Sequence, residues 1–410
     1  MRTATKFAFS ISLAAVCGAS DLRGQETTPD GKPAAVIRSE DASGHVLLQG
    51  PDGGPKDAQI GVRPGGPPRP PSFPEAKKIA QPKNDEELAA AVKKLADTLA
   101  SSGRFTGSIL VAADGKPLVN GAWDKADHER QIANTPETAY DVGSIGKLFT
   151  QVAILQLLQK GKLSLDETLG KYLTDYPDPD IASKVTIRQL LLHSSGMGDI
   201  FDQPGSEKLG SMMELKDFLP LFAHKPLAFE PGSKNLYSNA GYIVLGMVVE
   251  AVSGENYFSY IQSHILEPAG LSHSGFFDRR HLPDSVARSY EDGKDVTGAQ
   301  PERGCPAGGL QASTGDLLRL VQTINAGKLI SKDSVKLLRD MIPHPPDAPA
   351  PADDTKLTAY GIGGGAPGVN AGLSIDATGR YTRVVLCNAG PPMALSMGAT
   401  ISEWIKQMPK

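Results

Sequence analysis

The alternation of hydrophobic and polar positions along the chain predicts two β-hairpins that lie far apart in the sequence. Each consists of two short runs rich in apolar and β-branched residues, separated by a turn that contains glycine. The first hairpin pairs Phe105–Ala112 with Lys116–Trp123, and the second pairs Val369–Ile375 with Tyr381–Cys387. Both halves of the chain should therefore contribute strands to one antiparallel sheet.

Apolar positions at helical spacing predict the other elements. The expected helices are Asn84–Ser101, Leu148–Leu158, Thr186–His193, Asn239–Ser253, Tyr257–Leu266, Thr314–Ala326 and Met393–Gln407. Several are followed by a glycine, which readily adopts the left-handed conformation that ends a helix. The order of the elements predicts an α+β fold, an antiparallel sheet flanked by helices, with an all-helical lobe inserted at about residues 150–290.

The first residues show the pattern of a targeting segment. Arg2 and Lys6 precede the apolar run Phe7–Val16, which has the length of a secretory signal and is too short to span a bilayer. We therefore predict a signal peptide over residues 1–20 and a periplasmic or secreted mature protein. Lipid attachment at Cys17 is an alternative for the mature N-terminus.

Residues 21–83 are crowded with proline and glycine, which predicts a linker without catalytic residues. A short ordered piece is expected within it, around Ala34–Leu48. The folded domain is predicted to begin at Asn84, which can cap a helix, and to extend over residues 84–410.

The composition indicates a globular protein whose partner is a small-molecule or peptide substrate. Of its 410 residues, 40% are hydrophobic, which is enough for a large core. The formal net charge of −4 and the lack of basic runs give no reason to expect nucleic acid, and beyond the signal segment no run is apolar enough to span a membrane. Cys305 and Cys387 can pair in an oxidising compartment but are too isolated to build a metal site. No metal or cofactor is expected.

A serine and a lysine lie three residues apart where a long apolar helix begins. Ser144 and Lys147 would share one face of that helix, so that the amine lies within reach of the serine hydroxyl. Lysine has an ordinary pKa of about 10.4, so it serves as a base near neutral pH only where burial disfavours the ammonium. The pair is a candidate nucleophile and base, unless Ser144 merely caps the helix and Lys147 extends into solvent.

A second candidate group, Tyr237-Ser238-Asn239, lies between a Pro-Gly turn and an apolar helix. Tyr237 can relay a proton, and Asn239 can donate its amide to a substrate carbonyl. The alternative is that Asn239 caps the helix while the ring of Tyr237 packs beneath it.

Other catalytic patterns fit less well. Gly363–Gly368 matches G-x-G-x-x-G, but Pro367 lacks an N–H donor and a strand follows instead of a helix, which argues against a nucleotide site. We interpret His193 as a structural residue at a helix end, not a base for the serines that follow it. Cys305 is interpreted as a packed thiol and not as a nucleophile.

With these motifs the chain resembles the serine β-lactamase and penicillin-recognising enzyme family, in particular its class C, D-aminopeptidase and esterase-like branches. Gly143–Lys147 is similar to the nucleophile motif of the family, and Tyr237–Asn239 to its Tyr-x-Asn motif. Four further segments support the resemblance: Leu191–Gly196, Phe229–Gly232, Ala307–Gly309 and Ser313-Thr314. The resemblance covers roughly Glu86 to the C-terminus. It implies a β-lactamase-like fold, an acyl-enzyme on Ser144, and general-base roles for Lys147 and Tyr237.

The third motif departs from the family. Where the family has Lys-Thr-Gly or His-x-Gly on the sheet edge, this chain has Ile362–Gly364, and an aliphatic side chain cannot bind a substrate carboxylate. The resemblance still implies an oxyanion hole made by the backbone N–H groups of Ser144 and Gly365. The expected substrate-binding residues are Asn239, Gly364 and Gly365.

The sequence thus predicts an exported serine hydrolase that forms an acyl-enzyme on Ser144. Three substrate classes stay open: a β-lactam, a D-amino-acid peptide or a short ester. The alternative from another class is a non-catalytic penicillin-binding-like protein that keeps the fold with a degenerate third motif. Whether Ser144 can be acylated separates the two.

Overall fold

The computed structural model describes residues 73–409, apart from 202, 342–352 and 354, and the backbone of one hairpin nearer the N-terminus. In that hairpin, β1 (Val36–Glu40) pairs antiparallel with β2 (Val46–Gln49), where a short ordered piece was expected. The hairpin belongs to a separate unit of the chain, Met1–Arg69. The predicted signal peptide and most of the predicted linker lie outside the described residues.

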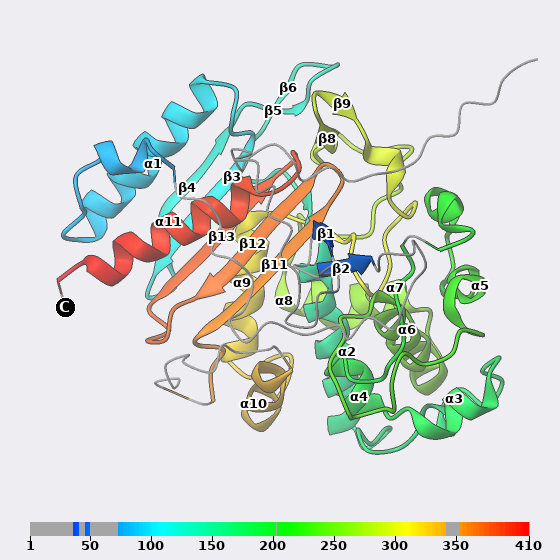
Figure 1. Cartoon of the computed structure of the whole chain (residues 1–410). Coiled ribbons are helices and arrows are strands. Elements are labelled where there is room, and N and C mark those ends of the chain that lie inside the picture. Colours follow the sequence, from blue (N-terminus) through cyan, green and yellow to red (C-terminus); the bar gives the residue numbers. More distant parts are fainter. Residues whose placement is uncertain are drawn as a thin grey trace, which may run out of the picture. The chain divides into compact units, whose positions relative to one another are not determined.

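The second unit, Pro70–Lys410, is built around one five-stranded antiparallel sheet (Figure 1). Its strands are β3 (Gly107–Ala113), β4 (Lys116–Trp123), β11 (Tyr360–Ala366), β12 (Val369–Ile375) and β13 (Tyr381–Cys387). The order β11-β12-β13-β3-β4 brings the two expected hairpins side by side, as the sequence predicted. Strand β11 forms one edge of the sheet.

Helices cover both faces of this sheet. On the outer face lie α1 (Asp85–Ser101) and α11 (Met393–Gln407), and on the inner face lies α9 (Thr314–Asn325) (Figure 1). Side chains of β3 alternate between two cores: Ile109 and Val111 pack with the outer helices, whereas Leu110 and Ala112 pack with the inner core. The strand is therefore buried along its whole length.

The described part of this unit begins ahead of the expected boundary at Asn84. Phe73 is buried in the outer core, and a short 3-10 helix, η1 (Ala76–Lys78), precedes α1. Asn84 does cap α1, because its side chain accepts the backbone N–H of Glu87.

A helical lobe follows β7 and precedes β8 in the chain, and it packs beside the β11 edge of the sheet (Figure 1). Its α-helices are α2 (Lys147–Gln159), α3 (Pro179–Lys184), α4 (Ile187–Leu191), α5 (Leu219–Phe222), α6 (Asn239–Ser253), α7 (Tyr257–Ile261) and α8 (Glu267–Ala269). Its 3-10 helices are η3 (Leu169–Lys171), η4 (Ser206–Ser211) and η5 (Leu215–Phe218), and a π-helical turn, η6 (Gln262–Leu266), continues α7. Helix α10 (Lys332–Asp340) packs against both α2 and α9.

Short strand pairs connect these parts. They are β5 (Lys125–Asp127) with β6 (Ile132–Ala133), β7 (Tyr140–Asp141) with β10 (Gln311–Ala312), and β8 (Tyr290–Glu291) with β9 (Lys294–Asp295). The 3-10 helix η7 (Thr297–Ala299) follows β9. The pairing of β7 with β10 matters most for the site, because β7 leads directly to Ser144.

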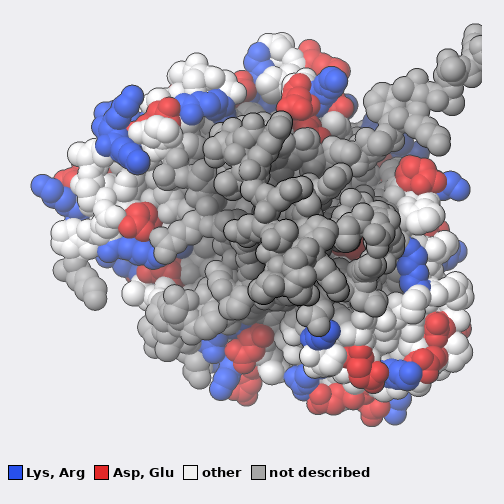
Figure 2. Space-filling model, viewed as in Figure 1, with Lys and Arg blue, Asp and Glu red and all other residues white. Residues whose placement is uncertain are grey.

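Cys305 and Cys387 do not form the disulfide that an oxidising compartment would allow. Cys305 and Cys387 are both free and buried, Cys305 in the inner core and Cys387 in the outer core. Within the described residues, no helix is long and apolar enough to cross a bilayer. On the face shown in Figure 2, Lys and Arg side chains are interspersed with Asp and Glu side chains over the coloured surface.

Candidate active site

Ser144 lies in a 3-10 turn, η2 (Gly143–Gly146), that leads directly into α2. Gly143 has a φ of +51°, a left-handed conformation that favours glycine, and it makes the turn possible. Ser144 makes no capping hydrogen bond to the helix. Its Oγ instead shares a 2.5 Å hydrogen bond with the Tyr237 hydroxyl and accepts one of 3.2 Å from Lys147 Nζ. The interpretation of Ser144 as a helix cap therefore does not hold.

Lys147 is buried in the first turn of α2, with only 3% of its surface exposed. Its Nζ donates to Asn239 Oδ1 at 2.7 Å and to the Ala307 carbonyl at 2.6 Å, in addition to Ser144 Oγ. The amine thus has three hydrogen-bond acceptors around it. The side chain does not extend into solvent, so the structure also rules out that alternative.

Two tyrosine rings complete the surroundings of this amine. Lys147 Nζ lies 4.7 Å from the ring centre of Tyr237 and 5.3 Å from that of Tyr242. Both distances are in the range of cation–π attraction. The amine is thus held by protein groups on several sides.

The Tyr237–Asn239 segment reaches the site because of how α6 begins. Ser238 is the residue that caps this helix: its Oγ accepts the N–H of Gly241 at 2.9 Å. Asn239 is therefore free of the capping role considered for it, and its side chain turns towards Lys147. The structure brings Ser144, Lys147, Tyr237 and Asn239 into one hydrogen-bonded group.

Asp199 completes this group and was not found from the sequence. Its carboxylate accepts hydrogen bonds of 2.9 and 3.0 Å from Asn239 Nδ2, which fixes the amide so that its oxygen faces Lys147. The Asn239 amide, expected to donate to a substrate carbonyl, is thus engaged by Asp199. Asp199 lies in an irregular loop after α4, at no spacing that marks it as a partner of Asn239.

His193 orients the tyrosine and has the structural role expected at the end of α4. It adopts a φ of +55°, and the N–H groups of His193 and Ser194 return to carbonyls of the last helical turn, as in a Schellman motif. Its ring stacks on Tyr237 with centres 4.6 Å apart, and its Nδ1 accepts the N–H of Ser238. Burial, and next the charge of Lys147, lower the pKa of His193 to about 3. The imidazole is therefore neutral near pH 7.

The glycines of β11 allow this edge strand to contact the nucleophile turn. A Cβ on Gly364 would lie 2.0 Å from the Val142 carbonyl oxygen and 3.1 Å from the Ser144 nitrogen. A Cβ on Gly143 would lie 2.9 Å from the Gly365 nitrogen. Only glycine permits such an approach, so Gly364 and Gly365 lie against the turn that carries Ser144.

Ile362 stands two residues before this contact, paired with Leu373 of β12. Its side chain is half-buried and packs against the inner core. It supplies no positive charge to this edge of the sheet.

The arrangement has the parts that nucleophilic catalysis needs: a hydroxyl in hydrogen-bond contact with a buried amine and a phenol, beside closely packed backbone. An antiparallel sheet and a helical lobe that join at Ser-x-x-Lys and Tyr-x-Asn motifs define the class of β-lactamase-fold serine hydrolases. Comparison with known families agrees. The chain belongs to the Beta-lactamase family, whose model matches residues 88–402.

Two bacterial proteins with curated names are among those similar to this chain. The putative penicillin-binding protein PbpX of Bacillus subtilis is 30% identical over 267 residues, which are 63% of this chain and 65% of that protein. A putative D-alanyl-D-alanine carboxypeptidase of Escherichia coli K12 is 31% identical over 184 residues, which are 41% of this chain and 42% of that protein. The chain thus spans less than two thirds of the length of these relatives.

Solved structures share the fold. A penicillin binding protein from Bacillus halodurans superimposes with a TM-score of 0.64 at 28% identity, covering 76% of this chain and 99% of that one. EstCE1, a hydrolase with promiscuous acyltransferase activity, gives a TM-score of 0.65 at 22% identity, covering 78% and 99%. At that identity the likeness to EstCE1 concerns the fold alone.

Proposed function

We propose that the protein is an exported serine hydrolase that transfers the acyl group of an ester or amide to Ser144 and then to water. The observation that carries this proposal is the position of Ser144 Oγ, 3.2 Å from the buried Lys147 Nζ and 2.5 Å from the Tyr237 hydroxyl. A serine hydroxyl is a weak nucleophile until a neighbouring base takes its proton. Both candidate bases are already in hydrogen-bond contact with it.

In the first half of the reaction, Ser144 Oγ attacks the carbonyl carbon while its proton passes to the Lys147–Tyr237 pair. The carbonyl oxygen becomes an oxyanion, which the backbone N–H groups of Ser144 and Gly365 would stabilise. Loss of one donor of this kind costs about 3 kcal/mol of transition-state stabilisation in other enzymes. The C–O or C–N bond then breaks, and the leaving group receives the proton from the pair.

In the second half, a water molecule attacks the ester formed on Ser144. Its proton passes to the Lys147–Tyr237 pair, and the carbonyl oxygen again carries the transient charge. When the acyl–Oγ bond breaks, Oγ recovers a proton from the pair and the acid is released. Asn239, held by Asp199, keeps the amine in place throughout.

The third motif favours a substrate without a carboxylate beside the scissile bond. Ile362 replaces the cation of the family motif and offers no partner for such a group. Among the substrate classes left open by the sequence, a short neutral ester loses nothing by this replacement, whereas β-lactams and D-alanyl peptides lose a charge-assisted hydrogen bond.

Export is supported by the signal-like pattern of residues 1–20 and by relatives named penicillin-binding proteins. The segment lies outside the described residues. Cell fractionation tests export. We expect the mature chain in the periplasmic or culture fraction, and we expect it to be absent there when charged residues interrupt the apolar run Phe7–Val16.

The test of the function is covalent labelling of the intact protein by a fluorophosphonate and, separately, by a penicillin. We expect one adduct on the parent, mapped to Ser144, and none on a folded Ser144→Ala variant, together with ester hydrolysis by the parent only. A folded parent that takes up neither reagent and hydrolyses no ester would favour the non-catalytic binding protein instead.

A further inference from the structure

The geometry assigns a positioning role to the buried ion pair between Arg279 and Asp141. We propose that this pair fixes the position of the turn that carries Ser144 relative to the segment Ala307–Gly309, whose Ala307 carbonyl binds Lys147. The inference rests on the proposed function of Ser144. It concerns two side chains outside the hydrogen-bonded group of the site.

Asp141 is the last residue of β7, and both oxygens of its carboxylate are used. Oδ1 accepts the N–H of Gly143 at 2.7 Å, which shapes the turn immediately before Ser144. Oδ2 accepts from Arg279 Nη2 at 2.6 Å. The side chains of Arg279 and Asp141 are only 3% and 5% exposed, so water does not compete for the contact.

Arg279 extends the link to the segment Ala307–Gly309. The same Nη2 donates to the Gly309 carbonyl at 3.1 Å, and Nε donates to the Pro301 carbonyl at 2.9 Å. Two residues before Gly309, the Ala307 carbonyl accepts the hydrogen bond of Lys147. One guanidinium therefore contacts the turn that presents the nucleophile and the turn that holds its base.

The two turns also contact each other directly. A Cβ on Gly308 would lie 2.8 Å from the Gly143 carbonyl oxygen and 3.4 Å from the Ser144 nitrogen. A shift of either turn would therefore change the spacing of Ser144 and Lys147. Without Arg279, the Asp141 carboxylate would be a buried charge without its cation, a costly state that is relieved by turning towards water or taking up a proton. Either change weakens its hold on Gly143.

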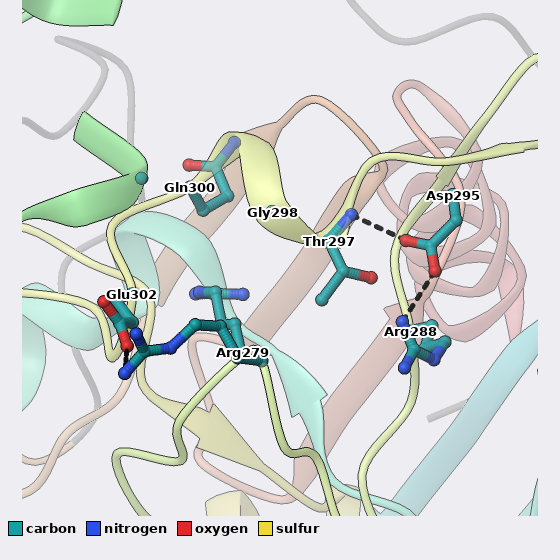
Figure 3. A pocket seen from close by; sticks show the side chains of 9 residues that line it. Arg279, Arg288, Asp295, Thr297, Gly298, Gln300 and Glu302 are labelled. Atoms are coloured by element: carbon teal, nitrogen blue, oxygen red, sulfur yellow. Dashed lines mark hydrogen bonds and ion pairs between the residues drawn. The ribbon is translucent and has the colours of Figure 1, made fainter. Parts of the chain in front are cut away.

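Arg279 is among the residues that line a pocket of about 350 Å³ (Figure 3). Other side chains that line it are Arg280, Arg288, Asp295, Thr297, Gln300 and Glu302. In the close-up the guanidinium of Arg279 borders this space, and Arg288 forms its own ion pair with Asp295 at 2.7 Å. Because Arg279 lines this pocket, truncation of its side chain would leave the space of its guanidinium open to the pocket and to a small cation that enters it.

The experiment compares Arg279→Ala with Arg288→Ala as a matched control. Arg288 lines the same pocket and pairs with another buried carboxylate, Asp127, but contacts neither turn of the site. For Arg279→Ala we expect kcat for an ester to fall about tenfold to a hundredfold, as misplacement of reacting groups does, with little change in KM. Millimolar guanidinium chloride should restore part of kcat, whereas sodium chloride at the same ionic strength should not. Arg288→Ala should keep the parental kcat and show no rescue.

A parental kcat in folded Arg279→Ala, or a loss of kcat that guanidinium does not reverse, would overturn the inference. If Arg279→Ala does not fold, Arg279→Lys serves instead, because it keeps a cation for Asp141 but cannot span both turns. It should fold with a reduced kcat and an unchanged KM, and a parental kcat would again overturn the inference.

Fluorophosphonate labelling of the parent separates the two proposals. An unlabelled, folded parent refutes the proposed function and the inference with it, whereas a labelled parent with unaffected Arg279 variants refutes the inference alone.

Discussion

At the scale of single residues, hydrogen bonding leaves Lys147 little freedom. Its amine is in contact with Ser144, Asn239 and the Ala307 carbonyl, and its surface is 3% exposed. The sequence identified Ser144, Lys147 and Asn239 as candidate site residues, because Ser-x-x-Lys and Tyr-x-Asn are local patterns, and the structure brings them into contact. It could not predict Asp199 or the Ala307 carbonyl, since their contacts depend on how distant loops meet.

His193 provides a prediction about stability at the same scale. Its pKa is lowered to about 3 by burial, whereas in the unfolded chain it is about 6.5. As the pH falls from about 6.5 to about 3, the unfolded chain binds this proton and the folded chain does not. The stability associated with neutral His193 is therefore complete above pH 6.5 and is lost progressively on acidification.

We expect a His193→Gln variant to lose less unfolding free energy between pH 7 and pH 4 than the parent does, since glutamine does not titrate. Denaturant unfolding at both pH values measures the difference. His224→Gln is the control, because His224 is exposed. A pH dependence in His193→Gln that equals that of the parent would show that His193 titrates normally in the folded protein.

At the scale of elements, apolar pattern and turn chemistry predicted the large pieces well. The bounds of β12, β13, α6 and α11 agree with those expected, because each has a continuous pattern that ends at turn or capping residues. Strand β11 had no such pattern. Four of its seven residues are glycine, which offers no side chain to mark a strand, and only the resemblance to the family located it.

The same glycines permit a test of β11 as part of the oxyanion hole. Gly364→Ala would place a methyl group 2.0 Å from the Val142 carbonyl oxygen, so the strand must move away from Ser144. We expect kcat for an ester to fall about a hundredfold or more, the usual effect of losing one oxyanion donor.

The matched control is Gly361→Ala on the same strand, where the added methyl would meet its nearest neighbour, Ser374 Cβ, at an ordinary 3.9 Å. Kinetics of ester hydrolysis and thermal unfolding of both variants separate loss of the site from loss of the fold. If folded Gly364→Ala retains the kcat of Gly361→Ala, the backbone of β11 has no part in catalysis.

At the scale of the whole molecule, the site depends on two parts that are distant in the sequence. The helical lobe supplies Ser144, Lys147 and Tyr237, and the sheet supplies the backbone at Gly364 and Gly365. In such an arrangement the sheet edge can change its substrate preference without altering the nucleophile. In the proposed function, Ile362 takes the place of the cation in the third motif of the family.

This leads to a prediction about substrate choice. A carboxylate clamp is worth roughly 1.5–3 kcal/mol as a charge-assisted hydrogen bond, or about tenfold to a hundredfold in kcat/KM. The parent should therefore prefer a nitrophenyl ester to a chromogenic cephalosporin. Ile362→Lys and Ile362→His should raise the ratio of kcat/KM for the cephalosporin to that for the ester by up to this factor.

The control is Ile362→Met, which has nearly the length of lysine without its charge and should leave the ratio unchanged. Because the ratio cancels losses common to both substrates, it isolates the effect of the charge from any damage to the core that Ile362 contacts. A parent that already favours the cephalosporin, with a ratio insensitive to the new cations, would mean that another residue binds the carboxylate.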